Sequence, residues 1–416
     1  MDTRGCDSGC GVNTAGEFRR GGWLLAGCTL GICAGVSSTY FYSLGLFIGP
    51  MAGEFGWGRG AASLGALVGT AAAALASPCV GPLVDRFGSR RVALASMLML
   101  ALSFAAMGRV TQGVASFLLC SFLLSLLTIG SGPLPYTRMI VAAYSRHRGL
   151  ALGIALAGTG LGALLIPRLL NPFIAVHGWR SGYYALSGAV LCALPITAWL
   201  LPRATEEVRP ARLAGGSLRD VLRNPLFLQL ASTFFLVSVA VFGMVVHFVP
   251  MLTDWGLRPA EAGAVAGWIG VSAVFSRLLI GRLLDRLAPG VVTAALFLAV
   301  ATVPAGFALL GQGYAVAGAI GLGLGIGAEV DLLAFLTSRY LPGNLYARAF
   351  GLLYALFLLG GAAGPAISGY LRQRLGGYGE FLGLASTLLM LAAAVSSALP
   401  RANRKTFTGT STSSSC

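Results

Sequence analysis

Twelve long apolar runs, almost free of charged side chains, constrain this chain more than any other feature of its sequence. Each run is about 17–28 residues long, enough for one α-helix to cross a hydrocarbon core of about 30 Å. Because 56% of the residues are hydrophobic and only 10% are charged, the chain cannot cover a water-exposed surface with polar groups. We therefore expect an all-α membrane protein with twelve transmembrane helices. The expected spans are residues 22–49, 61–82, 92–108, 114–136, 149–175, 183–201, 225–252, 261–284, 290–311, 314–338, 346–371 and 380–400.

The sequence also repeats itself at a constant shift of 200 residues. Gly81-Pro-Leu-Val-Asp85-Arg86 aligns without a gap with Gly281-Arg-Leu-Leu-Asp285-Arg286, and Arg148 aligns with Arg348. A repeat over such a length indicates a duplicated half, so we expect two six-helix pseudo-repeats. The predicted domains are a tail at 1–21, a first bundle at 22–201, a linker at 202–224, a second bundle at 225–400 and a tail at 401–416.

The basic residues predict the orientation in the membrane. Placing both tails and the even-numbered loops on one side puts 21 of the 29 Lys and Arg residues there. The positive-inside rule then assigns both termini to the cytoplasm. The strong preference for arginine, with Lys405 as the only lysine, is typical of a bacterium with a high genomic GC content. We therefore predict a multi-pass protein of a bacterial inner membrane.

Composition and spacing also exclude several classes of function. The net charge of +15 does not predict a nucleic-acid partner, because the arginines lie in loops between membrane spans. The three histidines are far apart, and the sequence has no Cys-x-x-Cys pair and no phosphate-binding loop. We expect neither an enzyme nor a cofactor, metal site or catalytic residue. The expected partners are the lipid bilayer and a small-molecule substrate, with the protein as a monomer.

The loop between spans 2 and 3 carries the pattern G-x-L-x-D-R-x-G-x-R, and a weaker copy follows span 8. With twelve spans in two halves, this pattern resembles the major facilitator superfamily of secondary transporters. The resemblance implies the major facilitator fold, transport by alternating access, and a cytoplasmic gate built by both loops. The gate residues so implied are Gly81, Asp85, Arg86, Gly88, Arg90, Gly281, Asp285 and Arg286.

Shorter patterns, including Arg148-Gly-Leu-Ala-Leu-Gly153 and Gly178-Trp-Arg180, resemble the monocarboxylate-porter and oxalate–formate-antiporter branch. That resemblance implies a small organic anion as substrate, moved with protons or by anion exchange, and an arginine in span 8 that meets its carboxylate. Arg277 stands at that position. The chain differs from the mammalian-type carriers at Tyr42 and Ala273, where those have lysine and aspartate, so a lysine–aspartate proton relay is not predicted.

Four charged side chains are predicted to lie deep in the spans, namely Arg168, Arg277, Glu329 and Asp331. A charge at the bilayer centre costs about 2.5–3.5 kcal/mol on the mildest scale, so each needs a partner or a wet cavity. Arg277 could bind the substrate anion or form a structural ion pair with span 10. Glu329 and Asp331 point about 200° apart on a helix, so at most one faces a central cavity. Either could couple protons to transport, or simply neutralise a buried arginine.

The remaining candidates for substrate contact are Tyr40, Tyr42, His247 and Arg168. The tyrosines could donate hydroxyls to a substrate or pack in the bundle. His247 could be an outer gate, although a hydrogen-bonded helix end is the commoner role. Arg168 could contact an anion or extend to the outer membrane face. Two other functions stay open: transport of a larger neutral or aromatic metabolite or drug, and a non-transporting membrane sensor.

Overall fold

The computed structural model describes residues 14–57, 59–202 and 218–400, and every regular element in these ranges is helical. Most of both predicted tails and of the predicted linker lies outside them. The elements are α1 (Thr14–Cys33), η1 (Ser37–Phe41), α2 (Leu44–Phe55), α3 (Arg59–Phe87), α4 (Ser89–Val110), α5 (Val114–Thr128), η2 (Ile129–Ser131), α6 (Pro133–Ala143), α7 (Arg148–Leu200), α8 (Leu218–Leu222), α9 (Pro225–Asp254), α10 (Pro259–Arg286), α11 (Pro289–Leu310), η3 (Gly311–Tyr314), α12 (Ala315–Tyr340), α13 (Tyr346–Leu375) and α14 (Gly379–Ser397).

The described residues contain ten apolar helical segments that are long enough to cross a membrane. Two of them, Arg148–Leu200 with 53 residues and Pro289–Tyr340 with 52 residues, would each extend for about 80 Å as straight helices. That is more than twice the hydrocarbon thickness, so each supplies two spans and the total is twelve. The turn within the first lies at Gly178, whose φ of 80° needs a residue without a Cβ.

The prediction of one uninterrupted helix for 22–49 and for 114–136 is wrong, because the first breaks around η1 and the second breaks around η2. Pro133 begins α6, and a proline disfavours helical backbone in the residue before it, so the chain breaks at Gly132. The two breaks meet: the Val36 amide donates to Ser131 Oγ at 3.1 Å. A Cβ on Gly35 would lie 2.3 Å from the Ser131 carbonyl oxygen, so only glycine allows this approach.

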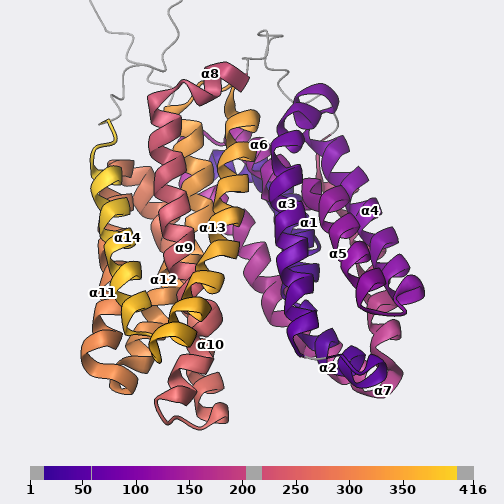
Figure 1. The fold of residues 1–416 in the computed structure, drawn as a ribbon. Helices are drawn as coiled ribbons and strands as arrows, with labels where there is room; N and C mark the ends of the chain where they lie inside the picture. Colours follow the sequence, from indigo (N-terminus) through magenta and orange to yellow (C-terminus); the bar gives the residue numbers. More distant parts are fainter. Residues whose placement is uncertain (1–13, 58, 203–217, 401–416) are drawn as a thin grey trace, which may run out of the picture.

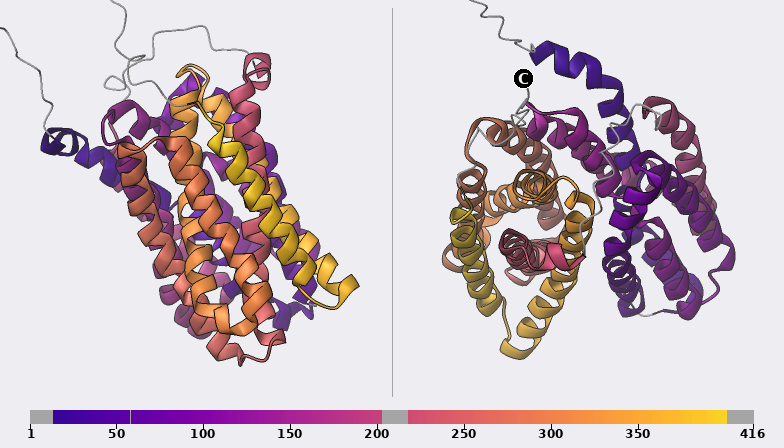
Figure 2. Two further views of the ribbon diagram at one scale, coloured as in Figure 1. Left: turned by 90° about the vertical axis from the view of Figure 1, so that its left-hand side faces the viewer. Right: turned by 90° about the horizontal axis from the view of Figure 1, so that it is seen from above.

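Figures 1 and 2 show two helical bundles side by side, the first built by the elements up to α7 and the second by those from α8. The bundles converge at the end that carries α8 and diverge toward the opposite end. Across the interface α3 packs against α13, and α7 packs against α10. The predicted bundle boundaries at 201 and 225 stay predictions, and α7 ends at Leu200 while α9 begins at Pro225.

Candidate site between the two bundles

A ladder of close contacts between α10 and α12 positions the buried charges. A Cβ on Gly323 would lie 2.3 Å from the Ile269 carbonyl oxygen, and a Cβ on Gly327 would lie 2.3 Å from that of Ala273. These contacts recur every four residues on both helices, so they follow one face of each helix. The next step of the same ladder brings Asp331 to Arg277.

Arg277 and Asp331 form a buried ion pair at that step, with Arg277 Nη1 donating to Asp331 Oδ1 at 2.7 Å. The two side chains are 8% and 1% exposed. This is the one hydrogen bond of the guanidinium to the described residues, and Asp331 Oδ2 has none. A Cβ built on Gly153 of α7 would lie 3.7 Å from Oδ2. The free carboxylate oxygen therefore faces the other bundle, and the structural ion pair to span 10 is present.

Glu329 lies on a different face of α12. It is 1% exposed, and its Oε1 has no hydrogen-bond partner among the residues that the structure describes. One helical turn earlier, Gly325 faces Val300 of α11 and Val241 of α9. Residues four apart share a helix face, so Glu329 belongs to the side of α12 that packs within the second bundle. Of the two acids, Asp331 is the one that pairs with Arg277.

Tyr354 of α13 was not among the predicted site residues, yet it joins the two bundles beside Arg277. Its hydroxyl approaches the Ser37 side chain of η1 in the first bundle, and Arg277 and Tyr42 are close enough to affect this hydroxyl electrostatically. Tyr354 is 7% exposed, whereas Tyr42 is 47% exposed. No motif in the sequence marks Tyr354, because a single tyrosine in an apolar span has no distinguishing pattern.

Two other candidates are occupied by structural contacts. Tyr40 is buried in the first bundle, where its hydroxyl donates to the Gly65 carbonyl at 3.4 Å. His247 Nε2 lies 3.0 Å from the Pro365 carbonyl oxygen and its Nδ1 lies 3.3 Å from the Tyr378 hydroxyl. Since a carbonyl can only accept, Nε2 donates to Pro365 and, in the neutral ring, Nδ1 accepts from Tyr378. Both environments favour the structural interpretations of these residues.

Arg168 is exposed on α7. Among the described residues it has no hydrogen bond or ion pair. The structure therefore does not bring Arg168 to the pair formed by Arg277 and Asp331.

At the α8 end, the acid of the second loop pattern reaches across to the first bundle. Asp285 of α10 accepts hydrogen bonds from the amides of Gly149 (2.7 Å) and Leu150 (2.9 Å). These amides belong to the first turn of α7. The N–H groups of a first helical turn have no carbonyl acceptor within their own helix. Asp285 thus caps α7 from the opposite bundle, and it also meets the positive end of the helix dipole.

Asp85, the acid of the first loop pattern, contacts arginine side chains instead of backbone amides. Asp85 Oδ1 lies 2.5 Å from Arg138 Nη1, and its Oδ2 lies 3.6 Å from Arg348 Nε of the second bundle. Nearby, the Tyr346 hydroxyl donates to Thr137 Oγ1 at 3.1 Å across the same interface. The two copies of the pattern therefore join the bundles through different chemistry.

The glycines of the two loop patterns have distinct structural reasons. A Cβ on Gly81 would lie 2.6 Å from the Ala347 carbonyl oxygen, and one on Gly281 would lie 2.5 Å from that of Gly149, so both allow the helices of opposite bundles to touch. Gly88 has a φ of 85° at the start of α4. Of the remaining predicted gate residues, Arg90 contacts its own bundle, where it donates to the Ala198 carbonyl at 2.7 Å. Arg86 and Arg286 are exposed.

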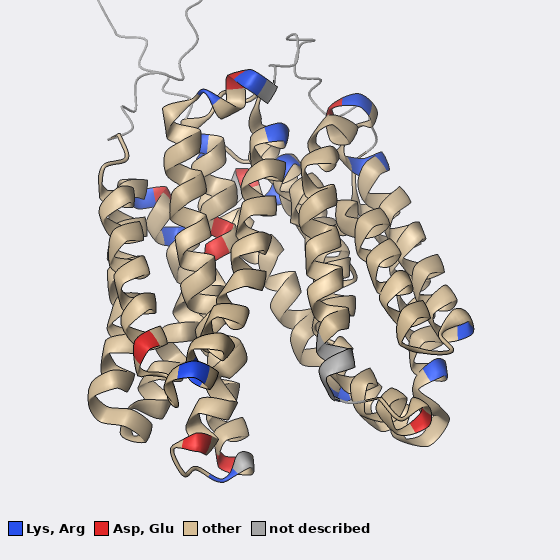
Figure 3. Cartoon of the chain, in the orientation of Figure 1, with Lys and Arg blue, Asp and Glu red and all other residues tan. Residues whose placement is uncertain are grey.

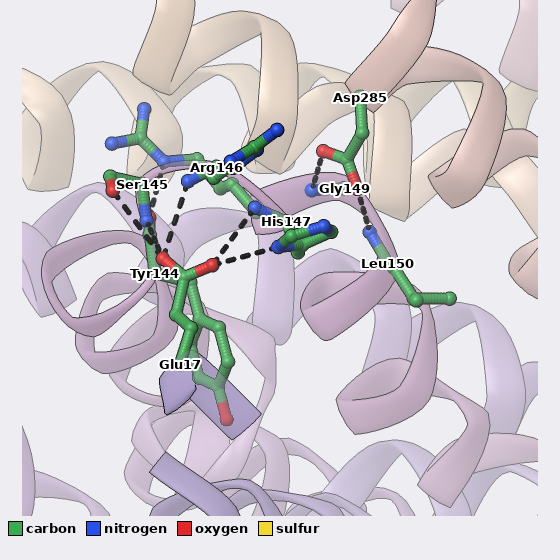
Figure 4. Close-up of polar contacts among 9 residues, drawn as sticks. Glu17, Tyr144, Ser145, Arg146, His147, Gly149, Leu150 and Asp285 are labelled. Carbon is green, nitrogen blue, oxygen red and sulfur yellow. Dashed lines mark hydrogen bonds and ion pairs between the residues drawn. The ribbon is translucent and has the colours of Figure 1, made fainter. Parts of the chain in front are cut away.

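Glu17, near the start of α1, holds the loop that leads into α7 (Figure 4). Its carboxylate accepts from the amides of Ser145, Arg146 and His147 at 2.7, 3.2 and 3.2 Å, and it lies 2.9 Å from His147 Nδ1. Partial burial raises the pKa of Glu17, but these hydrogen bonds outweigh it and lower the pKa below its ordinary value. Glu17 and Asp285 together bind five of six consecutive amides, from residue 145 to residue 150. No sequence pattern indicates this role for Glu17.

At the opposite end, the ion pairs between helices of the described residues stay within one bundle. Glu54 of α2 pairs with Arg180 of α7 at 2.6 Å, and Asp254 of α9 pairs with Arg372 of α13 at 2.6 Å. The interbundle polar contacts described above lie near the α8 end, where Figure 3 also shows the larger share of basic residues. The structure is therefore closed at the α8 end and parted at the other.

We predict that Glu17→Gln lowers the thermal stability of the purified protein at neutral pH, because a neutral amide accepts these hydrogen bonds more weakly. The pKa of Glu17 is lowered in the folded protein, so its contribution is complete above the ordinary glutamate pKa of about 4.3 and is lost as pH falls through the lowered value. The difference in melting temperature between the wild type and the variant should therefore stay nearly constant from about pH 7 to about pH 5 and should disappear only below about pH 4. Exposed Glu380→Gln is the control, and an equal effect there would contradict the prediction.

Comparison with known proteins shows which family has this architecture. A family model described as the Major Facilitator Superfamily matches residues 30–365. Monocarboxylate transporter 11 of Homo sapiens is 28% identical over 403 residues, which cover 92% of this chain and 83% of the relative. Multidrug resistance protein MdtG of Klebsiella pneumoniae is 31% identical over 229 residues, about half of each chain.

Solved structures agree on the fold. The fucose:proton symporter FucP of E. coli superposes with a TM-score of 0.69 and 14% identity, covering 91% of this chain and 98% of that one. Together with the twelve spans, the two bundles and the paired loop patterns, the match over residues 30–365 shows that the chain belongs to the Major Facilitator Superfamily of transporters.

Proposed function

We propose that this protein is a secondary active transporter that moves a small organic anion, resembling a monocarboxylate, across a bacterial inner membrane by alternating access. The similarity to monocarboxylate transporter 11 supports the substrate class. With both termini in the cytoplasm, the α8 end would be the cytoplasmic end. The structure then corresponds to a state closed to the cytoplasm and parted toward the outside.

The observation that carries the proposal is the incomplete pairing of Arg277. A guanidinium can bind a carboxylate through two parallel hydrogen bonds, yet Arg277 gives Asp331 only one. A substrate carboxylate with better geometry can therefore compete for Arg277 without a rearrangement of α10. The hydroxyl of Tyr354, which interacts electrostatically with Arg277, supplies a donor for the same anion.

Displacement of Asp331 provides a route to proton coupling. A carboxylate that loses its cationic partner in a buried site is strongly destabilised, and protonation removes that cost. Asp331 would then take up one proton for each substrate anion that binds Arg277, so the charge of the site stays constant. Without that proton uptake, the same site would exchange one anion for another.

The closed end supports a role for Asp85 and Asp285 as latches. Each joins one bundle to the other, so both contacts must break when the transporter opens to the cytoplasm. Because the latches lie outside the Arg277 site, they would set the balance between conformations rather than the contacts of the substrate.

We expect one or more small carboxylates to raise the melting temperature of the purified protein, and Arg277→Ala to abolish that shift. The panel contains carboxylates, aromatic acids and neutral metabolites. Arg277→Lys, which keeps the charge but loses the bidentate geometry, should show a reduced shift, and exposed Arg109→Ala is the matched control. A neutral compound that stabilises wild type and Arg277→Ala equally would instead support a larger neutral or drug-like cargo, the function named for MdtG.

Asp331→Asn tests the coupling. An amide cannot take up the proton, so proteoliposomes carrying this variant should lose accumulation of substrate driven by a pH gradient while retaining exchange of substrate across the membrane. Glu329→Gln is the matched control, because Glu329 has no hydrogen bond to Arg277 for the substrate to displace. Unchanged gradient-driven accumulation by Asp331→Asn would refute proton uptake at this residue.

Asp85→Asn tests the latch. It removes the charge that holds Arg138 and Arg348, so we expect the transport rate to fall several-fold while the dissociation constant of the substrate changes by less than twofold. Equilibrium binding and initial uptake rates, measured on the same preparation, separate the two effects. A transport rate equal to that of the wild type would remove the latch from the mechanism.

A further inference from the structure

An apolar groove of about 370 Å³ lies on the outer surface of the first bundle, away from the proposed substrate site. It runs between α3, α4 and the α5–η2 segment, which lie side by side (Figure 1). Leu75, Cys79 and Leu83 form its α3 wall, with Ser96 of α4 and Gly130 of η2 opposite. From Leu75 to Leu83 the groove follows α3 for about 12 Å. Its length and apolar lining suit a hydrocarbon chain.

The stripe of α3 that forms this wall ends in an arginine. Leu75, Cys79 and Leu83 are spaced by four residues and Arg86 follows three residues later, so all four lie on one helix face. Arg86 is exposed and stacks on the Phe87 ring at 5.2 Å. Arg91 of the adjoining α4 is also exposed at this end. Neither arginine has an ion pair among the described residues, so both are available to an external anion.

The second half of the chain lacks the small side chains along this groove and one of its two arginines. At a shift of 200 residues, Cys79, Ser96 and Gly130 correspond to the bulkier Leu279, Leu296 and Val330. A side chain at position 130 would fill the groove, because a Cβ on Gly130 would lie 2.3 Å from Ser96 Oγ. Arg91 corresponds to Val291, whereas the counterpart of Arg86 is Arg286. The first half therefore combines small side chains along the groove with a second arginine beside it, and the second half has neither of these two features.

We propose that this groove binds one anionic phospholipid from the leaflet at the α8 end, with an acyl chain along Leu75–Leu83 and the headgroup phosphate against Arg86 and Arg91. An aqueous anion would not need the apolar groove, and a neutral lipid would leave both arginines unpaired. The combination fits a molecule that carries an apolar chain and a negative headgroup.

Such a lipid would support the closed state of the transporter. The opposite side of α3 forms the interbundle contact, where Ser77 Oγ donates to the Gly351 carbonyl at 2.9 Å and Gly81 touches Ala347. An acyl chain bound between α3, α4 and α5 would pack against the face of α3 that points away from the second bundle. Bound lipid would therefore favour the conformation in which α3 lies against α13.

The test compares phosphatidylglycerol with phosphatidylcholine of the same acyl chains, added to delipidated wild-type protein and followed by native mass spectrometry and thermal unfolding. We expect one phosphatidylglycerol to be retained selectively and to raise the melting temperature. Arg86→Gln/Arg91→Gln should weaken that binding by about tenfold or more, whereas Arg286→Gln, the counterpart in the repeat, should leave it unchanged. Cys79→Leu/Ser96→Leu, which introduces the side chains of the repeat, should abolish binding of both lipids to the groove.

Equal retention of the two lipids by the wild type would overturn the proposal without recourse to any variant. Selective retention that survives Cys79→Leu/Ser96→Leu would also overturn it, because the headgroup would then bind without the groove. An equal loss in Arg286→Gln and in the double arginine variant would indicate a general effect of surface charge and would likewise refute the site. Each variant is compared at matched monodispersity, so misfolded protein does not enter the comparison.

Discussion

The buried ion pair between Arg277 and Asp331 is the interaction on which the proposed mechanism depends. Two charges with exposures of 8% and 1% are tolerated inside a membrane protein only together, because either one alone is strongly destabilised. Their approach requires α10 and α12 to lie in close contact, which Gly323 and Gly327 permit. The abundance of glycine in span 10 therefore serves the electrostatics of the site as well as helix packing.

The contacts at the α8 end also depend on carboxylates. These accept hydrogen bonds from amides, or form ion pairs with arginines, that belong to another part of the chain. Asp285 caps α7 from the opposite bundle, while Glu17 holds the loop immediately before it. The start of α7 is thus bound from two directions, by Asp285 of the opposite bundle and by Glu17 within the same bundle. In the proposed mechanism only the contact of Asp285 would break during transport, and Glu17 would keep the loop in place for that contact to form again.

Much of this structure could be predicted from the sequence, because span number, duplication and the loop patterns follow from hydrophobicity, length and local motifs. The location of Arg277 in span 8 could also be predicted, and the cost of a buried charge made an ion pair with span 10 one of the two roles that the sequence left open for it. The breaks at Gly35 and Gly132 could not, since the Val36 amide at the first break is satisfied by the Ser131 hydroxyl at the second, 95 residues away in the chain. Tyr354 and Glu17 were missed for the same reason: their partners are distant in sequence, and only tertiary packing brings them together.

The duplication shows how one architecture acquires two different halves. Ser77 and Ser131 occupy the positions that correspond to Arg277 and Asp331. Ser77 binds the Gly351 carbonyl across the interface, and Ser131 binds the Val36 amide at the break in span 1. The same two positions thus hold polar side chains in both bundles, because each lies where helices meet closely. Neutral serines there stabilise the packing of the first bundle, whereas the charged pair gives the second bundle the site at which we propose that the substrate anion binds.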